Sequence, residues 1–224
     1  MNRLRGWIGE KKTALYLWLS LNRKTYNVFH NIILPSTNGT TQIDHLIISE
    51  YGIFIVETKN KKGWIFGSEN QAKWTQTLYK RKYAFQNPLR QTYRQKIILC
   101  EFLKIEKYKV HTVVFFVGDC KFKTKLPNNV LKSRVGRYIK GFRRQILPTE
   151  TVSRITESLK IYRSESKFSN RDHRQSLKKR HGSITTCPRC GSKLVERTAK
   201  KGPNAGLKFL GCENYPKCKM TKKL

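Results

Sequence analysis

The segment Ile43–Asn60, with the sequence IDHLIISEYGIFIVETKN, constrains the fold more than any other part of the chain. It contains two apolar runs around a short polar turn, which is the pattern of a β-hairpin. With Glu50 and Tyr51 at the centre of the turn, residues pair outward from that point. Asp44 then opposes Glu57 on one face of the hairpin, because directly paired residues of an antiparallel ladder share a face.

The same register pairs Leu46 with Ile55 and brings Lys59 next to the two acids. Two opposed carboxylates in an apolar setting repel each other and lose hydration, so the arrangement is costly unless a cation lies between them. Magnesium or manganese suits such oxygen ligands and activates phosphoryl groups and water. Lys59 could orient the attacking water or stabilise charge that develops on a phosphate.

A structural alternative is that Glu57 and Lys59 are exposed charges on an outward strand face and that Asp44 only begins a strand. The run Ile53–Val56 argues against this alternative, because apolar residues on both faces indicate a strand buried on both sides. His45 follows Asp44 and should point to the opposite face. We therefore interpret His45, and His30 in the preceding apolar run, as packed or hydrogen-bonded residues and not as catalytic bases.

The remaining pattern predicts an α/β domain with a mixed sheet flanked by helices, as in restriction-endonuclease-like folds. The N-terminal 22 residues read as a helix, with Glu10 at the end of the stripe formed by Ala14, Leu17 and Leu21. Glu10 is either a site residue or a first-turn acid that favours the helix dipole. The other expected elements are strands Tyr26–Leu34, Gln42–Ile48, Gly52–Lys59, Gly63–Phe66 and His111–Val117, and a helix over Asn87–Leu103.

The chain has 47 Lys and Arg residues against 14 Asp and Glu, a formal net charge of +33 in 224 residues. Such an excess of positive charge predicts a polyanionic partner, and nucleic acid is the leading candidate because cations that neutralise phosphates release counterions. An anionic membrane surface is a weaker alternative, and we expect no membrane partner. The apolar run Ala14–Leu21 is too short to span a bilayer, and no secretory cleavage pattern follows it. We expect a soluble, cytoplasmic protein.

Four of the six cysteines crowd the C-terminal tail: Cys187, Cys190, Cys212 and Cys218. A C-x-x-C pair presents two thiolates to one ion, and a second pair about twenty residues later completes a tetrahedral Zn²⁺ site. Zinc binding would supply the folding free energy of a segment too short to bury much core. Two disulfides or a redox pair are the alternatives. Three regions follow: residues 1–150 as the main domain, 151–184 as a basic linker that contacts phosphates, and 185–224 as a zinc ribbon.

The main domain resembles a known family through an ordered series of short motifs. An Asp followed on the next strand by Glu-x-Lys, with a Glu on the first helix, is similar to the PD-(D/E)XK nuclease core. More narrowly, roughly residues 5–120 resemble the nuclease-related domain (NERD) family. The motifs are GE (Gly9-Glu10), VFHNIILP (Val28–Pro35), QIDHLIIS (Gln42–Ser49), GIFIVETKN (Gly52–Asn60), GWIFG (Gly63–Gly67), KWTQ (Lys73–Gln76) and NPLRQ (Asn87–Gln91).

This resemblance implies a metal-dependent phosphodiesterase, a hydrolase that cleaves DNA. Asp44 and Glu57 would be ligands of Mg²⁺ or Mn²⁺, Lys59 the catalytic lysine, and Glu10 an accessory acid that helps hold metal or water. Gln76 matches a glutamine that stands near the site in some superfamily members, although Gln91 is a second candidate and either could be structural. The alternative function is a non-catalytic DNA-binding protein that retains the fold, and an RNA-processing enzyme is a third possibility.

The tail resembles the C-terminal zinc ribbons of bacterial type I topoisomerases through CPxCG, the LVxR that follows, FxGC and the NYPxC ending. Those ribbons bind DNA, often single strands, by aromatic stacking and basic contacts. Tyr215 is the stacking candidate, whereas Phe209 is assigned to the ribbon core. The residues expected near phosphates are Arg189, Arg197, Lys200, Lys201 and Lys208, with a solvated face as the alternative for each.

Overall fold

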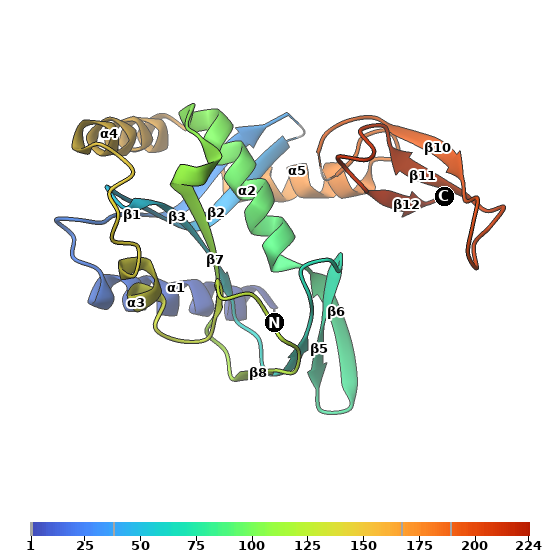
Figure 1. Cartoon of the computed structure of the whole chain (residues 1–224), viewed down its shortest axis with the longest axis horizontal. Coiled ribbons are helices and arrows are strands. Elements are labelled where there is room, and N and C mark those ends of the chain that lie inside the picture. The colour runs from blue at the N-terminus through green and yellow to red at the C-terminus, as the bar shows by residue number, and fades with distance from the viewer. Residues whose placement is uncertain (1, 38, 167, 189) are drawn as a thin grey trace. The chain divides into compact units, whose positions relative to one another are not determined.

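The computed structural model describes residues 2–37, 39–166, 168–188 and 190–224. By its internal contacts the chain divides into two compact units. The first consists of Met1–Ile32 and Gln42–Ser166, and the second of Ile33–Thr41 and Lys167–Leu224. Figure 1 shows the helices and strands of both units.

A mixed sheet forms the centre of the first unit. Within the described residues its strand order is β1-β2-β3-β7-β9. β2 and β3 are antiparallel, whereas β3 and β7, and β7 and β9, are parallel. This arrangement confirms the predicted mixed α/β fold. The strands are β1 (Asn27–Ser36), β2 (Gly39–Ser49), β3 (Gly52–Lys59), β7 (Val110–Phe116) and β9 (Val130–Leu131).

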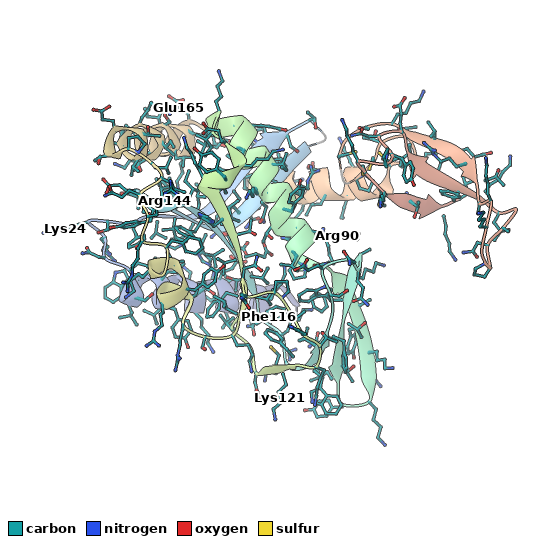
Figure 2. All side chains as sticks on the ribbon, viewed as in Figure 1. Lys24, Arg90, Phe116, Lys121, Arg144 and Glu165 are labelled. Carbon is teal, nitrogen blue, oxygen red and sulfur yellow. The ribbon has the colours of Figure 1, made fainter. Side chains whose placement is uncertain are left out.

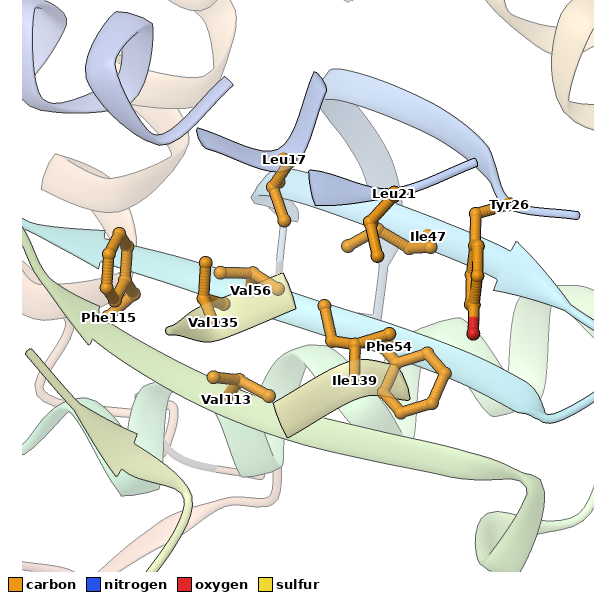
Figure 3. Packing of buried hydrophobic residues seen from close by; sticks show 10 residues of the cluster. All are labelled: Leu17, Leu21, Tyr26, Ile47, Phe54, Val56, Val113, Phe115, Val135 and Ile139. Carbon is orange, nitrogen blue, oxygen red and sulfur yellow. The ribbon is translucent and has the colours of Figure 1, made fainter. Parts of the chain in front are cut away.

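Helices cover both faces of this sheet, as the uninterrupted apolar run in β3 predicts. On one face, α1 (Asn2–Ser20) and α3 (Val135–Lys140) pack against Phe54 and Val56 of β3 (Figure 3). On the other face, α2 (Pro88–Leu103) packs against β3 and β7. The buried residues of α2 include positions 88, 92, 95 and 99, which form a single helical stripe.

A second, smaller sheet follows the central one in the same unit, with the strand order β6-β5-β4-β8 in the described part of the chain. Its strands are β4 (Gly63–Phe66), β5 (Lys73–Leu78), β6 (Arg81–Gln86) and β8 (Cys120–Phe122). Ile65 and Trp74 on one of its faces pack with Phe116 and Cys120. Figure 2 places Phe116 in the interior of the unit and Lys121 at its edge. Cys120 is therefore a core residue.

The expected linker contains two helices, α4 (Thr149–Glu165) and α5 (Asn170–Gly182). Val152, Ile155 and Leu159 of α4 are buried, and α4 belongs to the first unit. α5 begins with a capping box in which Ser169 and Asp172 satisfy each other's backbone groups. In the second unit, the Thr40 Oγ1 atom lies 2.8 Å from His173 Nδ1 of α5. The predicted domain boundaries stay predictions, but the segment between them is mainly helical.

The C-terminal part of the second unit is an antiparallel sheet with the order β10-β11-β12 among the described residues. It comprises β10 (Leu194–Thr198), β11 (Lys208–Cys212) and β12 (Thr221–Lys223). Its small core consists of Leu194, Leu210 and three buried cysteines.

The first unit also has a short 3₁₀ turn, η1 (Lys107–Lys109). No helix in the described residues is both long enough and apolar enough to cross a bilayer.

Asn87 fixes the point where the small sheet ends and α2 begins. It is fully buried, and its Nδ2 atom donates to the backbone carbonyls of Ser68, Glu69 and Gln71 at 2.7–3.1 Å. Its Oδ1 atom accepts a hydrogen bond from the Leu89 amide at 2.9 Å, which caps the helix. One side chain thus joins the loop before β5 to the first turn of α2.

We expect Asn87→Ala to lower the free energy of unfolding by about 3 kcal/mol, because it removes the cap and leaves buried carbonyls without a donor. Asn87→Ser keeps an acceptor for the cap but loses the amide donors, so it should restore only part of that loss. Chemical denaturation of both variants measures the difference. Equal stability of Asn87→Ala and wild type would contradict this role.

Candidate functional site

The β2–β3 hairpin has the register that the sequence predicts. Leu46 pairs with Ile55, and Ser49 pairs with Gly52 across the two-residue turn. Asp44 lies one step beyond the last ladder pair, and its Oδ2 atom accepts a hydrogen bond from the Thr58 backbone amide at 2.9 Å. Asp44 therefore reaches the end of β3.

Glu57 is the buried acid of this site, with a side chain that is 3% exposed. Its Oε1 atom forms an ion pair with the ammonium of Lys59, and its Oε2 atom accepts a hydrogen bond from Gln95 Nε2 at 2.9 Å. Lys59 also donates to Gln91 Oε1 at 3.0 Å. Gln91 and Gln95 lie one turn apart on α2, so both face the sheet. The helix thereby holds both members of the ion pair.

The charges of this site depend on one another. Burial raises the pKa of Asp44 well above its usual value, and the charge of Glu57 raises it further, while Lys59 partly offsets both effects. Burial by itself lowers the pKa of Lys59, but Glu57 and Asp44 outweigh burial, so the net shift is upward and the ammonium stays charged. The protonation of Asp44 therefore depends on its burial and on both of its charged neighbours.

Glu10 comes from α1, on the other face of the sheet. Burial raises its pKa, and the nearby charge of Glu57 adds to that shift. Gln76 lies in β5 of the small sheet, where its Nε2 atom donates to the Lys62 carbonyl at 2.7 Å. The structure thus brings Asp44, Glu57 and Lys59 together, places Glu10 within electrostatic reach, and gives Gln76 a backbone partner in the β3–β4 connection.

Gln95 was not predicted from the sequence, and Gln91 was only the second candidate for a glutamine near the site. A signal for both existed, because Gln95 is a polar residue on the apolar stripe of a helix and Gln91 lies one turn before it. A buried amide needs a hydrogen-bond partner. The Glu-x-Lys pair on the neighbouring strand provides one.

The buried His45 and the half-buried His30 form a hydrogen-bonded pair next to Thr58. Their Nδ1 atoms are 2.7 Å apart, and His45 Nε2 lies 3.2 Å from Thr58 Oγ1. The Thr58 hydroxyl donates in turn to Thr13 Oγ1 of α1 at 2.9 Å. Burial and the neighbouring imidazole lower the pKa of His45 to about 3, so the ring is neutral. This confirms the interpretation of His45 as a packed, hydrogen-bonded residue. The contact with His45 also holds Thr58, whose backbone amide donates to Asp44.

The four tail cysteines converge on one point. Their sulfur atoms all lie within 4.8 Å of one another, and they form the only such group of three or more metal-ligating side chains among the described residues. Cys187 and Cys218 are 3.8 Å apart, and Cys190 and Cys212 are 3.4 Å apart. Tetrahedral zinc with bonds of about 2.3 Å separates its sulfurs by about 3.8 Å. The cluster therefore matches a structural zinc site, as the spacing predicts.

A groove of about 670 Å³ lies on the ribbon beside this cluster. Arg197, Lys200, Phe209 and Tyr215 contribute to its lining, and the Arg197 guanidinium lies 5.9 Å from the centre of the Tyr215 ring. Tyr215 is 61% exposed, whereas Phe209 is half-buried. Phe209 was predicted to belong to the ribbon core, but the buried core residue is the adjacent Leu210.

Two of the other residues predicted to contact phosphates do not line this groove. The Lys208 ammonium forms an ion pair with Glu196 at 2.7 Å, and Lys201 is exposed. Arg189 lies outside the described residues. Within the described ribbon, the groove thus combines two of the predicted cations with the predicted stacking tyrosine.

Comparison with known proteins adds to this geometry. An uncharacterized protein of Bacillus anthracis is 42% identical over 120 residues, which are 53% of this chain and 56% of that protein. DNA topoisomerase 1 of Archaeoglobus fulgidus is 43% identical over 52 residues, or 23% of this chain and 7% of the topoisomerase. The uncharacterized protein YrdD of Escherichia coli is 46% identical over 39 residues, or 17% of this chain and 19% of YrdD. No solved structure is significantly similar.

The chain thus spans about half the length of the first of these relatives and smaller shares of the other two. Residues 184–224 match the family described as topoisomerase DNA binding C4 zinc finger. Residues 5–117, which contain the hairpin, the ion pair and α2, match the family described as nuclease-related domain. That match covers half of the 224 residues, and the chain therefore belongs to the nuclease-related domain family.

Proposed function

We propose that this protein is a metal-dependent DNA nuclease whose zinc ribbon helps to hold the substrate. The observation that carries the proposal is the cluster at the end of β3, in which Lys59 lies between Glu57 and a glutamine of α2 while Asp44 reaches the same strand end. Carboxylates that can hold a metal ion, next to a charged lysine, supply groups that hydrolysis of a phosphodiester uses.

The residues present suit a hard divalent cation. Asp44 and Glu57 offer carboxylate oxygens, which magnesium and manganese prefer. Only Oδ2 of Asp44 accepts a hydrogen bond from the described residues, so Oδ1 remains open as a ligand. Burial, and then the charge of Glu57, raise the pKa of Asp44, and a bound dication would favour its charged form. When bound, the metal would polarise a phosphoryl oxygen and make water more acidic.

The side chains divide the remaining work. Lys59 would stabilise the negative charge that develops on the scissile phosphate during in-line attack by water. Gln91 positions the ammonium and Gln95 positions the carboxylate of Glu57, so neither group needs to reorganise when substrate binds. Glu10 would orient the attacking water from the α1 side.

A non-catalytic DNA-binding protein is the second candidate. One observation favours it: both oxygens of Glu57 are already engaged, one by Lys59 and one by Gln95. In that case the ion pair would be structural. The net charge of +33 and the ribbon groove would serve DNA binding in either case.

The decisive test is cleavage of labelled single- and double-stranded DNA with Mg²⁺ or Mn²⁺. We expect Lys59→Ala and Glu57→Gln each to reduce the rate at least about 100-fold, because each removes a charge placed for the transition state. Lys24→Ala removes an exposed cation and should leave the rate within about twofold of wild type. If wild type cuts no faster than Lys59→Ala in either metal, the nuclease proposal fails and the second candidate stands.

Metal binding has a second readout in stability. The folded-state pKa of Asp44 is raised, so its contribution to stability is present below the unfolded pKa of about 3.9 and is lost as pH rises through the folded value. Without metal, Asp44→Asn should therefore melt at a higher temperature than wild type at pH 7, and this advantage should disappear toward pH 4. Added Mn²⁺ should raise the melting temperature of wild type only. An equal rise in both proteins would contradict the assigned ligand.

For the ribbon, we expect one zinc ion per chain in elemental analysis. Cys212→Ser should lose most of that zinc and weaken DNA binding, since a ribbon without metal does not fold. Cys100→Ala provides the control, because Cys100 is buried in α2 and should not affect zinc content. Full zinc content in Cys212→Ser would refute the assigned set of ligands.

A further inference from the structure

The β5–β6 hairpin carries a row of side chains that the proposed site does not use. Trp74 pairs with Phe85, and the next same-face pairs along the ladder bring Tyr83 and Arg81 of β6 onto that face. Trp74 packs into the core of the small sheet, so this is the inner face of the hairpin. Alternate residues on a strand are about 6.7 Å apart, so the three β6 side chains form a regular row.

The row begins beside the carboxylate site. The Lys61 ammonium lies 4.7 Å from the centre of the Phe85 ring. Lys59 is the last residue of β3, and Lys61 follows it by two residues in the β3–β4 connection. β6 ends one residue before the N-cap of α2, the helix that brings Gln91 to Lys59.

The row ends at the hairpin turn, far from α2 (Figure 1). Leu78 pairs with Arg81, so Tyr79 and Lys80 alone form the turn. Tyr79 is 93% exposed and has φ +52°, a left-handed conformation that is uncommon for a residue other than glycine. An aromatic ring held there is open to stacking by a ligand.

The exposed fraction rises along the row. Phe85 is half-buried, Tyr83 is 46% exposed, and Tyr79 is almost fully exposed. Cations accompany these rings: Lys61 lies over Phe85 at one end, and Arg81 lies between the two tyrosines along the chain. We refer to this set of side chains as the hairpin track: Lys61, Phe85, Tyr83, Arg81, Lys80 and Tyr79.

Exposed rings with cations beside them suit a single nucleic-acid strand. Every base has a π-face that can stack on an exposed ring, and the cations can pair with the phosphates. A duplex keeps its bases stacked inside and offers the rings little. Pairing of a second copy along the β6 edge is disfavoured by the Lys80–Lys82 run of cations and by the repulsion between two chains of charge +33.

We propose that the hairpin track binds one nucleic-acid strand as that strand leaves the carboxylate site. The choice of a nucleic acid as the polyanion rests on the proposed function, but the track itself requires only binding. Gln76 gains a role here: it pairs with Tyr83 across the ladder and holds the Lys62 carbonyl, so it supports the start of the track.

The opposite face of the same hairpin supplies matched controls. Trp64 of β4 pairs with Thr77, and Thr77 pairs with Lys82, so Trp64 and Lys82 share the outer face. Trp64 is 48% exposed and Tyr83 is 46% exposed, so an alanine at either position removes an aromatic side chain of similar exposure. Lys82→Ala removes one charge next to Arg81 in sequence but on the outer face.

The test is the affinity of the full, zinc-loaded chain for a labelled single-stranded oligonucleotide without added Mg²⁺ or Mn²⁺. We expect Tyr83→Ala and Arg81→Ala each to weaken binding at least about fivefold, and Tyr83→Phe to bind as wild type because the ring remains. Trp64→Ala and Lys82→Ala should stay within about twofold of wild type. Thermal melting checks that each variant is folded.

Each outcome separates the track from the nuclease site. If the outer-face variants weaken binding as much as the track variants, or the track variants do not weaken it, the track proposal is overturned whatever the cleavage assay shows. If the track variants weaken binding in a protein that cuts no DNA, the track stands and the nuclease proposal fails alone. If the track variants lose binding to phosphatidylserine vesicles but keep their binding to the oligonucleotide, the proposal is overturned in favour of a lipid surface.

Discussion

The buried ion pair at the end of β3 is the interaction on which the first unit depends. Glu57 is almost fully buried, and Lys59 and Gln95 engage its two oxygens. An uncompensated charge at this depth would cost several kcal/mol. The partners come from one strand and one helix, so α2 must lie over β3 in a single position. The sheet, the helix and the site are therefore specified together.

The position of α2 depends in turn on the small sheet. The start of the helix is fixed by Asn87, which binds the loop before β5, and Gln91 follows one turn later. The small sheet thus helps to determine where Lys59 finds its second partner. The hairpin track grows from the same connection, since β6 runs directly into the N-cap of α2. Substrate guidance and site geometry would share one structural element.

The zinc site and the carboxylate site differ in how much tertiary structure brings their residues together. The cysteines of the ribbon lie close together in the chain, next to a three-stranded sheet, and their sulfur atoms lie within 4.8 Å of one another. Spacing alone therefore predicts the zinc site. The carboxylate site draws on α1, the β2–β3 hairpin and α2, and the sequence does not state which residues of a distant helix will face it. Gln95 shows this, because its role follows only from the packing of α2.

By itself the sequence determined the hairpin register, the four-cysteine cluster and the mixed α/β class, since each depends on local periodicity or close spacing. It did not disclose β5 and β6, because most β6 side chains are exposed and lack an apolar alternation. α5 was also not predicted, although Ser169 and Asp172 form a capping box that signals a helix start. Only the tertiary structure decided that Gln91 and Gln95 contact the ion pair and that Gln76 binds a backbone carbonyl. These contacts join segments far apart in the chain, and their geometry is set by packing, which no local pattern encodes.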